Sequence, residues 1–281
     1  MSHYSILCQT GSYVQFKKAQ SSVGYTILFS GIAWVTGQMI LGSNLISGHS
    51  RLICDKFTEE KCWRYLAKYN ATALFITAPD AIAMMKYGNP NKCETPYLRA
   101  IAIFGAKTSQ KNMTTLRGHF QNPMVTMNLY GISEVFGLVF SFKDISAFMR
   151  KPETVGLPAR GFQYKIVNPE TGKNCGPNET GEIHLKTKFY MTGYYNQDSS
   201  IHFDEDGFFK TGDMGYYDED HCFFIVDRVK ETFKYYNYWV SPTQLESILL
   251  EHPAVKEACV IGIPCDVVSC WNIQPSKKLV L

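Results

Sequence analysis

Short apolar runs separated by helical segments recur through the first 150 residues, and this alternation restricts the fold more than any other feature. Thr58–Tyr69 is the clearest helix, because Thr58 can serve as its N-cap and two glutamates occupy its first turn. A second helix is expected from Pro79 to Met85. Strands that alternate with helices at this spacing predict an α/β domain with a largely parallel sheet over residues 1–150. The strand-like runs are Tyr25–Ser30, Arg51–Cys54, Ala73–Thr77 and Leu98–Phe104.

The pattern changes after Lys151. From there on, short alternating runs are separated by turns rich in Pro, Gly and Asn. These runs predict a small antiparallel subdomain, or a small β-barrel, over residues 151–226. The alternating runs are Phe162–Val167, Gly181–Leu185 and Phe223–Val226.

A third unit is expected over residues 229–281. Ser241-Pro242-Thr243-Gln244 is a capping box with proline at the first helical position, so a helix should begin there and stop at Pro253. A strand is expected at Val255–Ile261. Because one helix and one strand bury little apolar surface, this unit is expected to be incomplete, with a divergent tail from about residue 265 onward.

Charge and cysteine content argue against several kinds of partner. The net charge is +3 over 281 residues and no basic run occurs, so neither nucleic acid nor an anionic membrane surface is indicated. The nine cysteines are odd in number and contain no C-x-x-C pair, which argues against a disulfide framework or a structural zinc site. A reducing compartment, and hence a cytoplasmic location, is the expectation.

The stretch Ala19–Ser50 contains no charged residue and is long enough to cross a membrane. Five glycines interrupt it, however, and Gln38 and Asn44 lie in its middle. A buried strand followed by a glycine-broken buried helix explains this composition better, so no membrane span is expected.

Tyr130-Gly131-Ile132-Ser133-Glu134 is the first of three clusters that point to a nucleotide. A tyrosine ring can stack on a purine, a serine hydroxyl can bond a phosphate, and a glutamate can hold Mg²⁺ through its hard oxygen ligands. Taken alone, a string this short is more often an ordinary loop.

The other two clusters are a carboxylate on a glycine turn and a run of charges. In Lys210-Thr211-Gly212-Asp213, Asp213 could accept hydrogen bonds from the two hydroxyls of a ribose, although an Asp that satisfies its own turn is an equally good explanation. In Asp227–Lys234, the guanidinium of Arg228 suits phosphate or ribose oxygens. For that run alone, a solvated interdomain linker is the better explanation.

In this order and at this spacing, the clusters resemble the signature of AMP-forming adenylating enzymes, in particular the insect luciferase-like and 4-coumarate–CoA-ligase-like acyl-CoA synthetases. Phe223–Lys234 and Leu245–Pro253 are most similar to that branch, and the resemblance runs from Met1 to about Asp266. It implies part of the family's large N-terminal domain, a parallel-rich α/β sheet plus a small β-barrel. A hinge at residues 227–228 and the start of the small α+β C-terminal domain would follow.

The resemblance also implies which residues contact the base and phosphate of ATP. Gly105 and Ala106 would lie against the adenine, with Tyr130 on its other face. Gly131 would let the backbone come close to the nucleotide, and Ser133 would bond the α-phosphate.

Further roles follow from the same resemblance. Glu134 would ligate Mg²⁺, and Asp213 would hold the ribose hydroxyls. Arg228 would also reach the ribose, while Lys230 and Lys234 would assist with phosphate contacts and with the thioester step. The residues with catalytic roles would be Ser133, Glu134, Arg228 and Lys234.

The implied reaction activates a small carboxylic acid, fatty or aromatic, with ATP to an acyl adenylate and then transfers the acyl group to coenzyme A. Ser30–Trp34 falls where the family has an acyl-pocket motif. The sequence identifies neither the acid nor the oligomeric state, and nothing in it specifically indicates light emission. The family also suggests peroxisomes, although the final Leu-Val-Leu is not an S-K-L address.

The chain departs from the family pattern in several places. No G-K-[ST] or T-x-G-x-x-K-G string occurs, so the phosphate loop is absent from these 281 residues, and no adenylation lysine is recognised. Phe104 and Leu129 stand where glycines are usual. The chain is therefore expected to be truncated at both ends and to give negligible adenylation. The alternatives are a non-catalytic nucleotide-binding or interaction protein, or a truncated product without independent activity.

Overall fold

The computed structural model divides into two compact units. Unit 1 comprises Met1–Gln163, Lys186–Ile201 and Asp220–Phe224, and unit 2 comprises Tyr164–Leu185, His202–Glu219 and Ile225–Leu281. The domain limits predicted at residues 150, 226 and 228 stay predictions. The structure describes residues 2–18, 25–121, 124–141, 150–235, 238–250, 252, 254–255, 258–265 and 270–275.

A five-stranded sheet in the order β2-β1-β3-β4-β5 is the centre of unit 1. Each pair of neighbouring strands in it is parallel, so the predicted parallel α/β sheet is confirmed. The chain first steps from β1 outward to β2 and then crosses back to place β3 on the other side of β1. The strands are β1 (Tyr25–Leu28), β2 (Ser50–Ile53), β3 (Ala71–Thr77), β4 (Ala100–Phe104) and β5 (Val125–Leu129).

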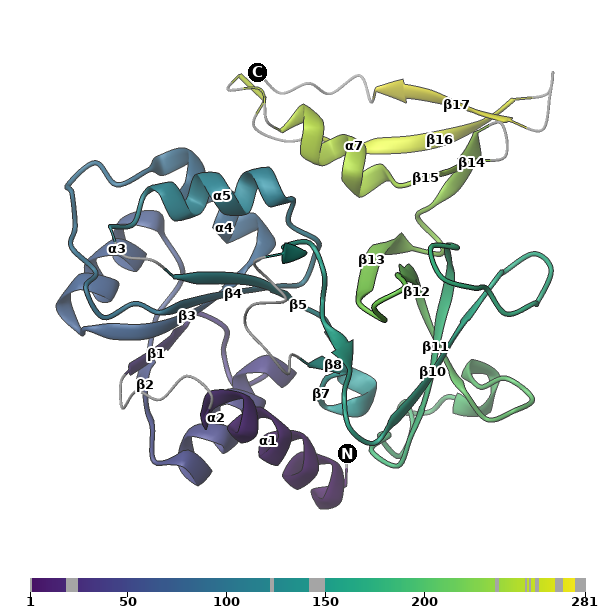
Figure 1. Cartoon of the computed structure of the whole chain (residues 1–281), viewed down its shortest axis with the longest axis horizontal. Helices are drawn as coiled ribbons and strands as arrows, with labels where there is room; N and C mark the ends of the chain where they lie inside the picture. The colour runs from purple at the N-terminus through teal and green to yellow at the C-terminus, as the bar shows by residue number, and fades with distance from the viewer. Residues whose placement is uncertain are drawn as a thin grey trace. The chain divides into compact units, whose positions relative to one another are not determined.

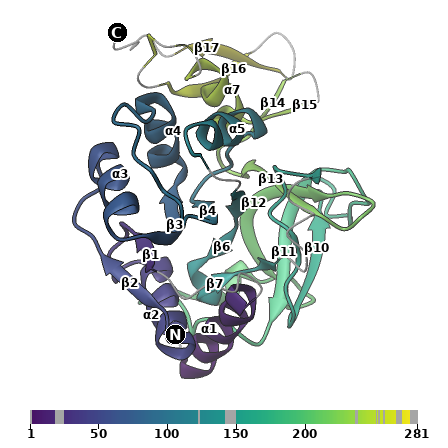
Figure 2. The same ribbon diagram turned by 60° about the vertical axis from the view of Figure 1, so that its left-hand side comes forward.

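Helices cover both faces of this sheet, as Figures 1 and 2 show. Helices α3, α4 and α5 lie along one face, and α1 and α2 lie along the other. The sequence predicted α2, α3 and α4 but not α1 or α5. The helices are α1 (His3–Lys18), α2 (Val35–Ser47), α3 (Glu59–Lys68), α4 (Ala78–Tyr87) and α5 (Gln110–Gly118).

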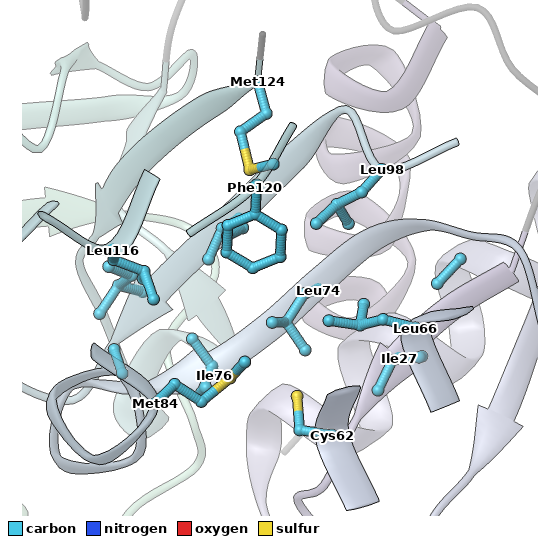
Figure 3. Close-up of a cluster of buried hydrophobic side chains, with 14 of the residues drawn as sticks. Ile27, Cys62, Leu66, Leu74, Ile76, Met84, Leu98, Leu116, Phe120 and Met124 are labelled. Carbon is cyan, nitrogen blue, oxygen red and sulfur yellow. The ribbon is translucent and has the colours of Figure 1, made fainter. Parts of the chain in front are cut away.

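Alternate side chains of the strands enter different cores. On β3, Leu74 and Ile76 face α3, α4 and α5, whereas Phe75 belongs to the cluster that includes Met39 of α2. Figure 3 shows the first of these clusters, with Leu74 and Ile76 among side chains that come from helices. Because both faces are covered, the strands are nearly continuous apolar runs, which is why the sequence alone located them.

Side-chain caps set the starts of several helices. The Thr58 hydroxyl accepts a hydrogen bond from the Lys61 backbone N–H at 3.2 Å, as the sequence predicted for α3. Thr77 does the same for α4, which begins at Ala78 with its proline at the next position. Such caps stabilise a helix by about 1 kcal/mol each.

Unit 2 is built around a four-stranded sheet in the order β10-β11-β12-β13. β11 and β12 pair antiparallel, which agrees with the predicted antiparallel subdomain. Among the described residues the sheet is open, with β10 and β13 at its edges, so the barrel alternative is not what forms. The strands are β10 (Phe162–Val167), β11 (Gly181–Thr187), β12 (Phe209–Tyr217) and β13 (Phe223–Arg228).

The described residues of the C-terminal part of unit 2 include one helix and two antiparallel strand pairs. β14 (Phe233–Tyr235) pairs antiparallel with β15 (Tyr238–Val240), and α7 (Pro242–Leu249) follows. The Ser241 hydroxyl accepts a hydrogen bond from the Gln244 backbone N–H, which confirms the predicted cap. The predicted stop at Pro253 lies outside the described residues.

The strand predicted at Val255–Ile261 begins later than expected. β16 spans Val260–Cys265 and pairs antiparallel with β17 (Cys270–Pro275). Its first residue is held by a hydrogen bond from the Val260 backbone N–H to the Glu246 carboxylate of α7 at 2.9 Å. A partner strand and a helix side chain therefore set this register, and neither is visible in the local sequence.

The uncharged stretch forms β1 and α2 where it is described, as predicted. Over the described ranges, none of the helices has the length and apolar character needed to span a membrane.

Candidate functional site

The carboxyl ends of β4 and β5 bring two of the predicted nucleotide-binding segments to the same edge of the sheet. Phe104 and Leu129, the last residues of these strands, are direct partners in the parallel ladder. Gly105 and Ala106 follow the first strand, and Tyr130 follows the second. In open α/β sheets, ligands bind at this edge, where loops leave the carboxyl ends of the strands.

Gly105 and Ala106 are exposed, so their backbone is open to a ligand. Gly105 has a φ of +90°, in the left-handed region that disfavours other residues. Phe104 before it is half-buried and packs against the sheet core that contains Phe136. Phe104 stands where the family usually has glycine. Its side chain therefore packs partly against the protein and does not extend wholly into solvent at the end of β4.

Asn128, the next-to-last residue of β5, holds the loop after β4. The Thr108 backbone N–H donates to Asn128 Oδ1 at 3.2 Å, and Asn128 Nδ2 donates to the Thr108 carbonyl at 3.1 Å. Asn128 is only 2% exposed, so both bonds are shielded from water. The sequence analysis missed this residue, although a single amide in an apolar strand is a visible signal.

The segment Tyr130–Glu134 turns sharply at the end of β5. Gly131 lies in β6 (Gly131–Ile132), which pairs antiparallel with β7 (Gly137–Leu138). A Cβ on Gly131 would lie 2.4 Å from the Gly137 carbonyl oxygen, so only glycine fits. The half-buried Tyr130 ring lies 5.6 Å, centroid to centroid, from the Phe140 ring. Gly131 is thus required by the hairpin itself, whatever it does for a nucleotide.

Ser133 and Glu134 lie in the short 3₁₀ helix η1 (Ser133–Val135) that links these two strands. Ser133 is exposed, and no described residue bonds its hydroxyl. Behind them, Gln9 of α1 donates from Nε2 to the Val135 carbonyl at 3.1 Å in a buried position. This bond ties η1 to a helix that the sequence analysis did not predict.

Glu134 is held by a segment about 60 residues later in the chain. The Tyr194 hydroxyl donates to Glu134 Oε1 at 2.5 Å, and the Met191 backbone N–H donates to the Glu134 carbonyl at 2.7 Å. The pKa of Tyr194 is raised well above its ordinary value, chiefly by burial and also by the bond to the Glu134 carboxylate. Glu134 Oε2 has no bonding partner within the described part of the chain.

In unit 2, Asp213 lies at a β-bulge inside β12, where the sequence predicted a glycine turn. The Thr211 hydroxyl donates to the Ile183 carbonyl at 2.7 Å, and Gly212, with a φ of +74°, donates its N–H to Glu182 Oε1 at 3.0 Å. Asp213 is 7% exposed, and its Oδ1 lies 3.4 Å from Arg228 Nε. The structure therefore brings together two residues that the sequence assigned to ribose binding.

A charged network supports the bulge at Gly212. His184 lies between two carboxylates, with Nδ1 2.8 Å from Asp204 Oδ2 and Nε2 3.3 Å from Glu182 Oε2. Lys165 Nζ lies 2.9 Å from the same oxygen of Asp204. Burial raises the pKa of Asp204, but bonds from Lys165, the Phe208 backbone and His184 outweigh it and hold that pKa well below its usual range. The sequence analysis did not identify this network, whose members come from β10, from β11 and from the segment before β12.

Glu182 responds in the same sense as Asp204. Burial raises its pKa, but the bonds from His184 and from the Gly212 N–H outweigh that effect, so the pKa of Glu182 is lowered overall. A carboxylate that stays ionised is a strong acceptor for the Gly212 N–H, which fixes the backbone before Asp213.

The two predicted hinge residues have different environments. Asp227 is 8% exposed, and its carboxylate accepts bonds from the Ser241 hydroxyl at 2.6 Å and from the Thr243 N–H at 3.0 Å. Arg228 is exposed. Asp227 thus caps the N-terminus of α7, while the hinge stays a prediction.

The remaining predicted residues are two lysines of unit 2 and the predicted acyl-pocket segment. Lys230 is exposed in the turn after β13, and Lys234 lies in β14 with a side chain outside the described part of the structure. Ser30–Trp34 leads from β1 into α2, and its first carbonyl, Ser30 O, accepts a bond from Arg51 Nη2 at 2.9 Å. The predicted acyl-pocket segment therefore also follows the carboxyl end of a parallel strand.

Comparison with known proteins identifies this arrangement. Residues 1–195 match the family described as AMP-binding enzyme. The chain belongs to the AMP-binding enzyme family. Within this family, it is 33% identical over 270 residues to a Dictyostelium discoideum protein named probable 4-coumarate–CoA ligase 2, covering 94% of this chain and 48% of that protein. The chain thus spans about half the length of the curated relatives that it matches.

Solved AMP-binding enzymes share the fold. The luciferase-like enzyme from the nonluminescent mealworm Zophobas morio superposes with a TM-score of 0.71 at 31% identity, covering 83% of this chain and 54% of that one. The o-succinylbenzoate CoA synthetase of Bacillus subtilis, solved with an acyl-adenylate intermediate, superposes with a TM-score of 0.81 at 22% identity, covering 98% of this chain and 54% of that one. The resemblance to adenylate-forming enzymes seen in the sequence is confirmed.

Proposed function

We propose that this chain carries nucleotide-binding elements of an AMP-forming acid–thiol ligase. In the proposed reaction, a carboxylate oxygen attacks the α-phosphorus of ATP and pyrophosphate leaves. The thiol of coenzyme A then attacks the acyl carbon, and AMP leaves. Family membership supports this reaction type, and relatives named as CoA ligases support the thiol acceptor.

The arrangement of Ser133 and Glu134 carries the proposal. Both follow the carboxyl end of β5, on a short helix tied to α1 and to the segment around Tyr194. The hydroxyl of Ser133 and Oε2 of Glu134 have no partner among the described residues. Rigidly placed polar groups without protein partners are what a phosphate and its cation need, because orienting them then costs little on binding.

Mg²⁺ fits the chemistry of Glu134. A carboxylate oxygen is a hard ligand, and a single carboxylate together with substrate phosphates is a usual way for proteins to hold this ion. When bound, Mg²⁺ would neutralise charge on the phosphates of ATP. The residues of the chain would do the rest by position: Ser133 would donate to the α-phosphate, and Gly105 and Ala106 would present open backbone to the adenine.

Residues of unit 2 would contribute contacts to the sugar. Bonds from Thr211 to the Ile183 carbonyl and from the Gly212 N–H to Glu182 fix the backbone before Asp213, and Arg228 lies beside the Asp213 carboxylate. A carboxylate so placed can accept both hydroxyls of a ribose. We propose Lys230 and Lys234 as phosphate and thioester contacts and residues 227–228 as the hinge, all on the resemblance to the family alone.

A pair of serine variants tests the nucleotide site. Ser133→Ala removes an exposed hydroxyl in one 3₁₀ helix, and Ser200→Ala removes an exposed hydroxyl in another, η2 (Ser199–His202). Isothermal titration of the 281-residue chain with AMP and with adenosine should show AMP bound about tenfold more weakly by Ser133→Ala, with adenosine unaffected, because the lost bond is to a charged phosphate. Ser200→Ala should match the wild type with both ligands.

Equal losses of AMP and adenosine would contradict the assigned role of Ser133. Binding of AMP without any substrate-dependent ATP–pyrophosphate exchange would favour the alternative, a nucleotide-binding protein without catalysis. Negligible exchange is also what the sequence predicts, because no phosphate-loop string occurs in these 281 residues. On the resemblance to the family, we also propose a fatty or aromatic acid as the substrate, and the cytoplasmic or peroxisomal location stays a prediction.

A further inference from the structure

One segment of unit 1 contacts Glu134 through both its main chain and its side chain. The segment, Tyr190–Ser199, is called the tether here. Its Met191 N–H donates to the Glu134 carbonyl at 2.7 Å, and its Tyr194 hydroxyl donates to Glu134 Oε1 at 2.5 Å. Two bonds at opposite ends of one residue fix both the place of its backbone and the direction of its carboxylate.

The tether is itself held in place. The Tyr194 N–H donates to the Ser199 hydroxyl at 2.9 Å, which fixes the backbone that carries the ring. Ser5 of α1 donates from its hydroxyl to the Tyr190 carbonyl at 3.4 Å, a long bond that places the start of the tether against α1. The hydroxyl that reaches Glu134 is therefore borne on a backbone with its own anchors.

Tyr194 and its neighbour differ in a way that argues for a specific role. Tyr195 is 90% exposed, whereas Tyr194 is half-buried and its hydroxyl donates a hydrogen bond to the Glu134 carboxylate. A tyrosine that served only to fill space would not need a hydroxyl directed at the Glu134 carboxylate. The bond occupies Oε1 and leaves Oε2 without a partner in the described residues.

We propose that Tyr194 is a positioning residue, which holds the Glu134 carboxylate so that Oε2 can bind the divalent cation that accompanies ATP. The proposal deepens the proposed function and rests on the assignment of Glu134 to the cation. Carboxylates that bind metal ions are usually hydrogen-bonded in turn, and loss of such an outer partner weakens metal affinity by about 10–100-fold. Donation from the hydroxyl also takes up part of the negative charge of the carboxylate oxygen, which by itself would weaken the attraction of the carboxylate for the cation.

These two effects of the hydroxyl have opposite signs, so the variant Tyr194→Phe separates them. The variant keeps the ring and removes only the O–H group. The cation should bind the variant more weakly if orientation dominates, and more tightly if the effect on the carboxylate charge dominates. Orientation should dominate, because a freed carboxylate would rotate among several rotamers and lose entropy on each binding event.

The test is a Mn²⁺ titration of the 281-residue chain with ATP, followed by the electron paramagnetic resonance of free Mn²⁺. The variants are Tyr194→Phe, Glu134→Gln and the matched control Tyr195→Phe, and ATP affinity is also measured without metal. Tyr194→Phe should bind Mn²⁺ about tenfold more weakly, with its metal-free ATP affinity unchanged. Tyr195→Phe should match the wild type, and Glu134→Gln should lose at least as much as Tyr194→Phe.

A purely structural role for Tyr194 would lower metal-free ATP affinity as well, so the split between the two affinities decides between the roles. Unchanged or tighter Mn²⁺ binding by Tyr194→Phe, beside a loss in Glu134→Gln, would overturn the positioning role alone. Wild-type binding of Mn²⁺ by Glu134→Gln, or no metal-dependent ATP binding by the wild type, would overturn the assignment of Glu134 and the positioning role together.

A second variant keeps the test decisive if Tyr194→Phe does not fold. Ser199→Ala removes the hydroxyl that anchors the Tyr194 backbone but leaves the tyrosine intact. It should weaken Mn²⁺ binding in the same direction and by less than tenfold, again without change in metal-free ATP affinity. Wild-type Mn²⁺ affinity in Ser199→Ala would overturn the role of the tether as a support.

Discussion

The Asp227 carboxylate and the Ser241 hydroxyl are joined by a 2.6 Å hydrogen bond across 14 residues of the chain, and both are buried. The same carboxylate accepts a hydrogen bond from the Thr243 N–H, one of the amides at the start of α7 that have no carbonyl partner within the helix. Asp227 therefore joins the end of β13 to the helix that follows the second hairpin strand, β15.

Removal of this carboxylate should loosen α7. Asp227→Ala leaves the Thr243 N–H without its acceptor and leaves the Ser241 hydroxyl only the longer bond, 3.3 Å, to the Val226 carbonyl. The expected cost to the local stability of the helix is about 2 kcal/mol. Hydrogen exchange of the amides from Thr243 to Leu249 should then be about tenfold faster or more. Asp227→Asn, which keeps one acceptor oxygen, should have a smaller effect, and equal exchange in all three proteins would show that the cap contributes nothing.

The proposed contact between Asp213 and the ribose can be tested with nucleotides that have or lack the ribose hydroxyls. Asp213→Ala should weaken AMP binding about tenfold or more, because a charged acceptor for the ribose hydroxyls is lost. The affinity for 2′,3′-dideoxy-AMP should be the same in variant and wild type, since this ligand has no hydroxyls to donate.

The exposed Glu205, in the turn before β12, provides the control for that experiment. Glu205→Ala should leave both affinities unchanged when they are measured by titration calorimetry. A parallel loss for AMP and the dideoxy analogue in Asp213→Ala would mean that Asp213 supports the fold of its turn and does not contact the ribose.

The network around Asp204 should make the free energy of unfolding depend on pH. Its pKa is lowered in the folded protein, so its ionised form stabilises the fold at pH values above the unfolded pKa of about 4. As the pH falls below that value, the unfolded chain takes up the proton first and the advantage shrinks. Asp204→Asn should therefore cost about 1–2 kcal/mol at pH 7 and progressively less toward pH 2.

Urea unfolding at pH 7, 5 and 3 measures this dependence. Glu205→Gln, at the exposed neighbouring position, should follow the wild type at each pH. A difference between Asp204→Asn and the wild type that stays constant with pH would show that geometry, and not the charge of Asp204, stabilises the network.

Replacement of a buried and of an exposed leucine should have different effects on the stability of unit 1. Leu74 of β3 is 1% exposed, whereas Leu45 of α2 is 76% exposed. Leu74→Ala should lower the free energy of unfolding by about 2–5 kcal/mol, because it leaves a cavity in the cluster of Figure 3. Leu45→Ala should change it by less than about 0.5 kcal/mol. Similar losses for both leucines in chemical unfolding would contradict the assigned core.

The sequence alone was sufficient for features set by neighbours along the chain. Thr58 and Ser241 were recognised as caps because the acceptor and the amide lie three residues apart. Strand β3 was recognised because a strand buried on both faces is apolar throughout. Family membership was visible because Tyr130–Glu134, Asp213 and Asp227–Lys234 keep the order and spacing of the adenylating signature.

Only the tertiary structure decided features that join distant parts of the chain. The register of β16 depends on β17 and on Glu246, so the predicted start at Val255 was wrong. The open order of the four-stranded sheet depends on which strands pair, and alternation reports only which faces are buried. The contact between Tyr194 and Glu134 spans 60 residues, and no periodicity, cap or turn signal in the sequence links two side chains that far apart.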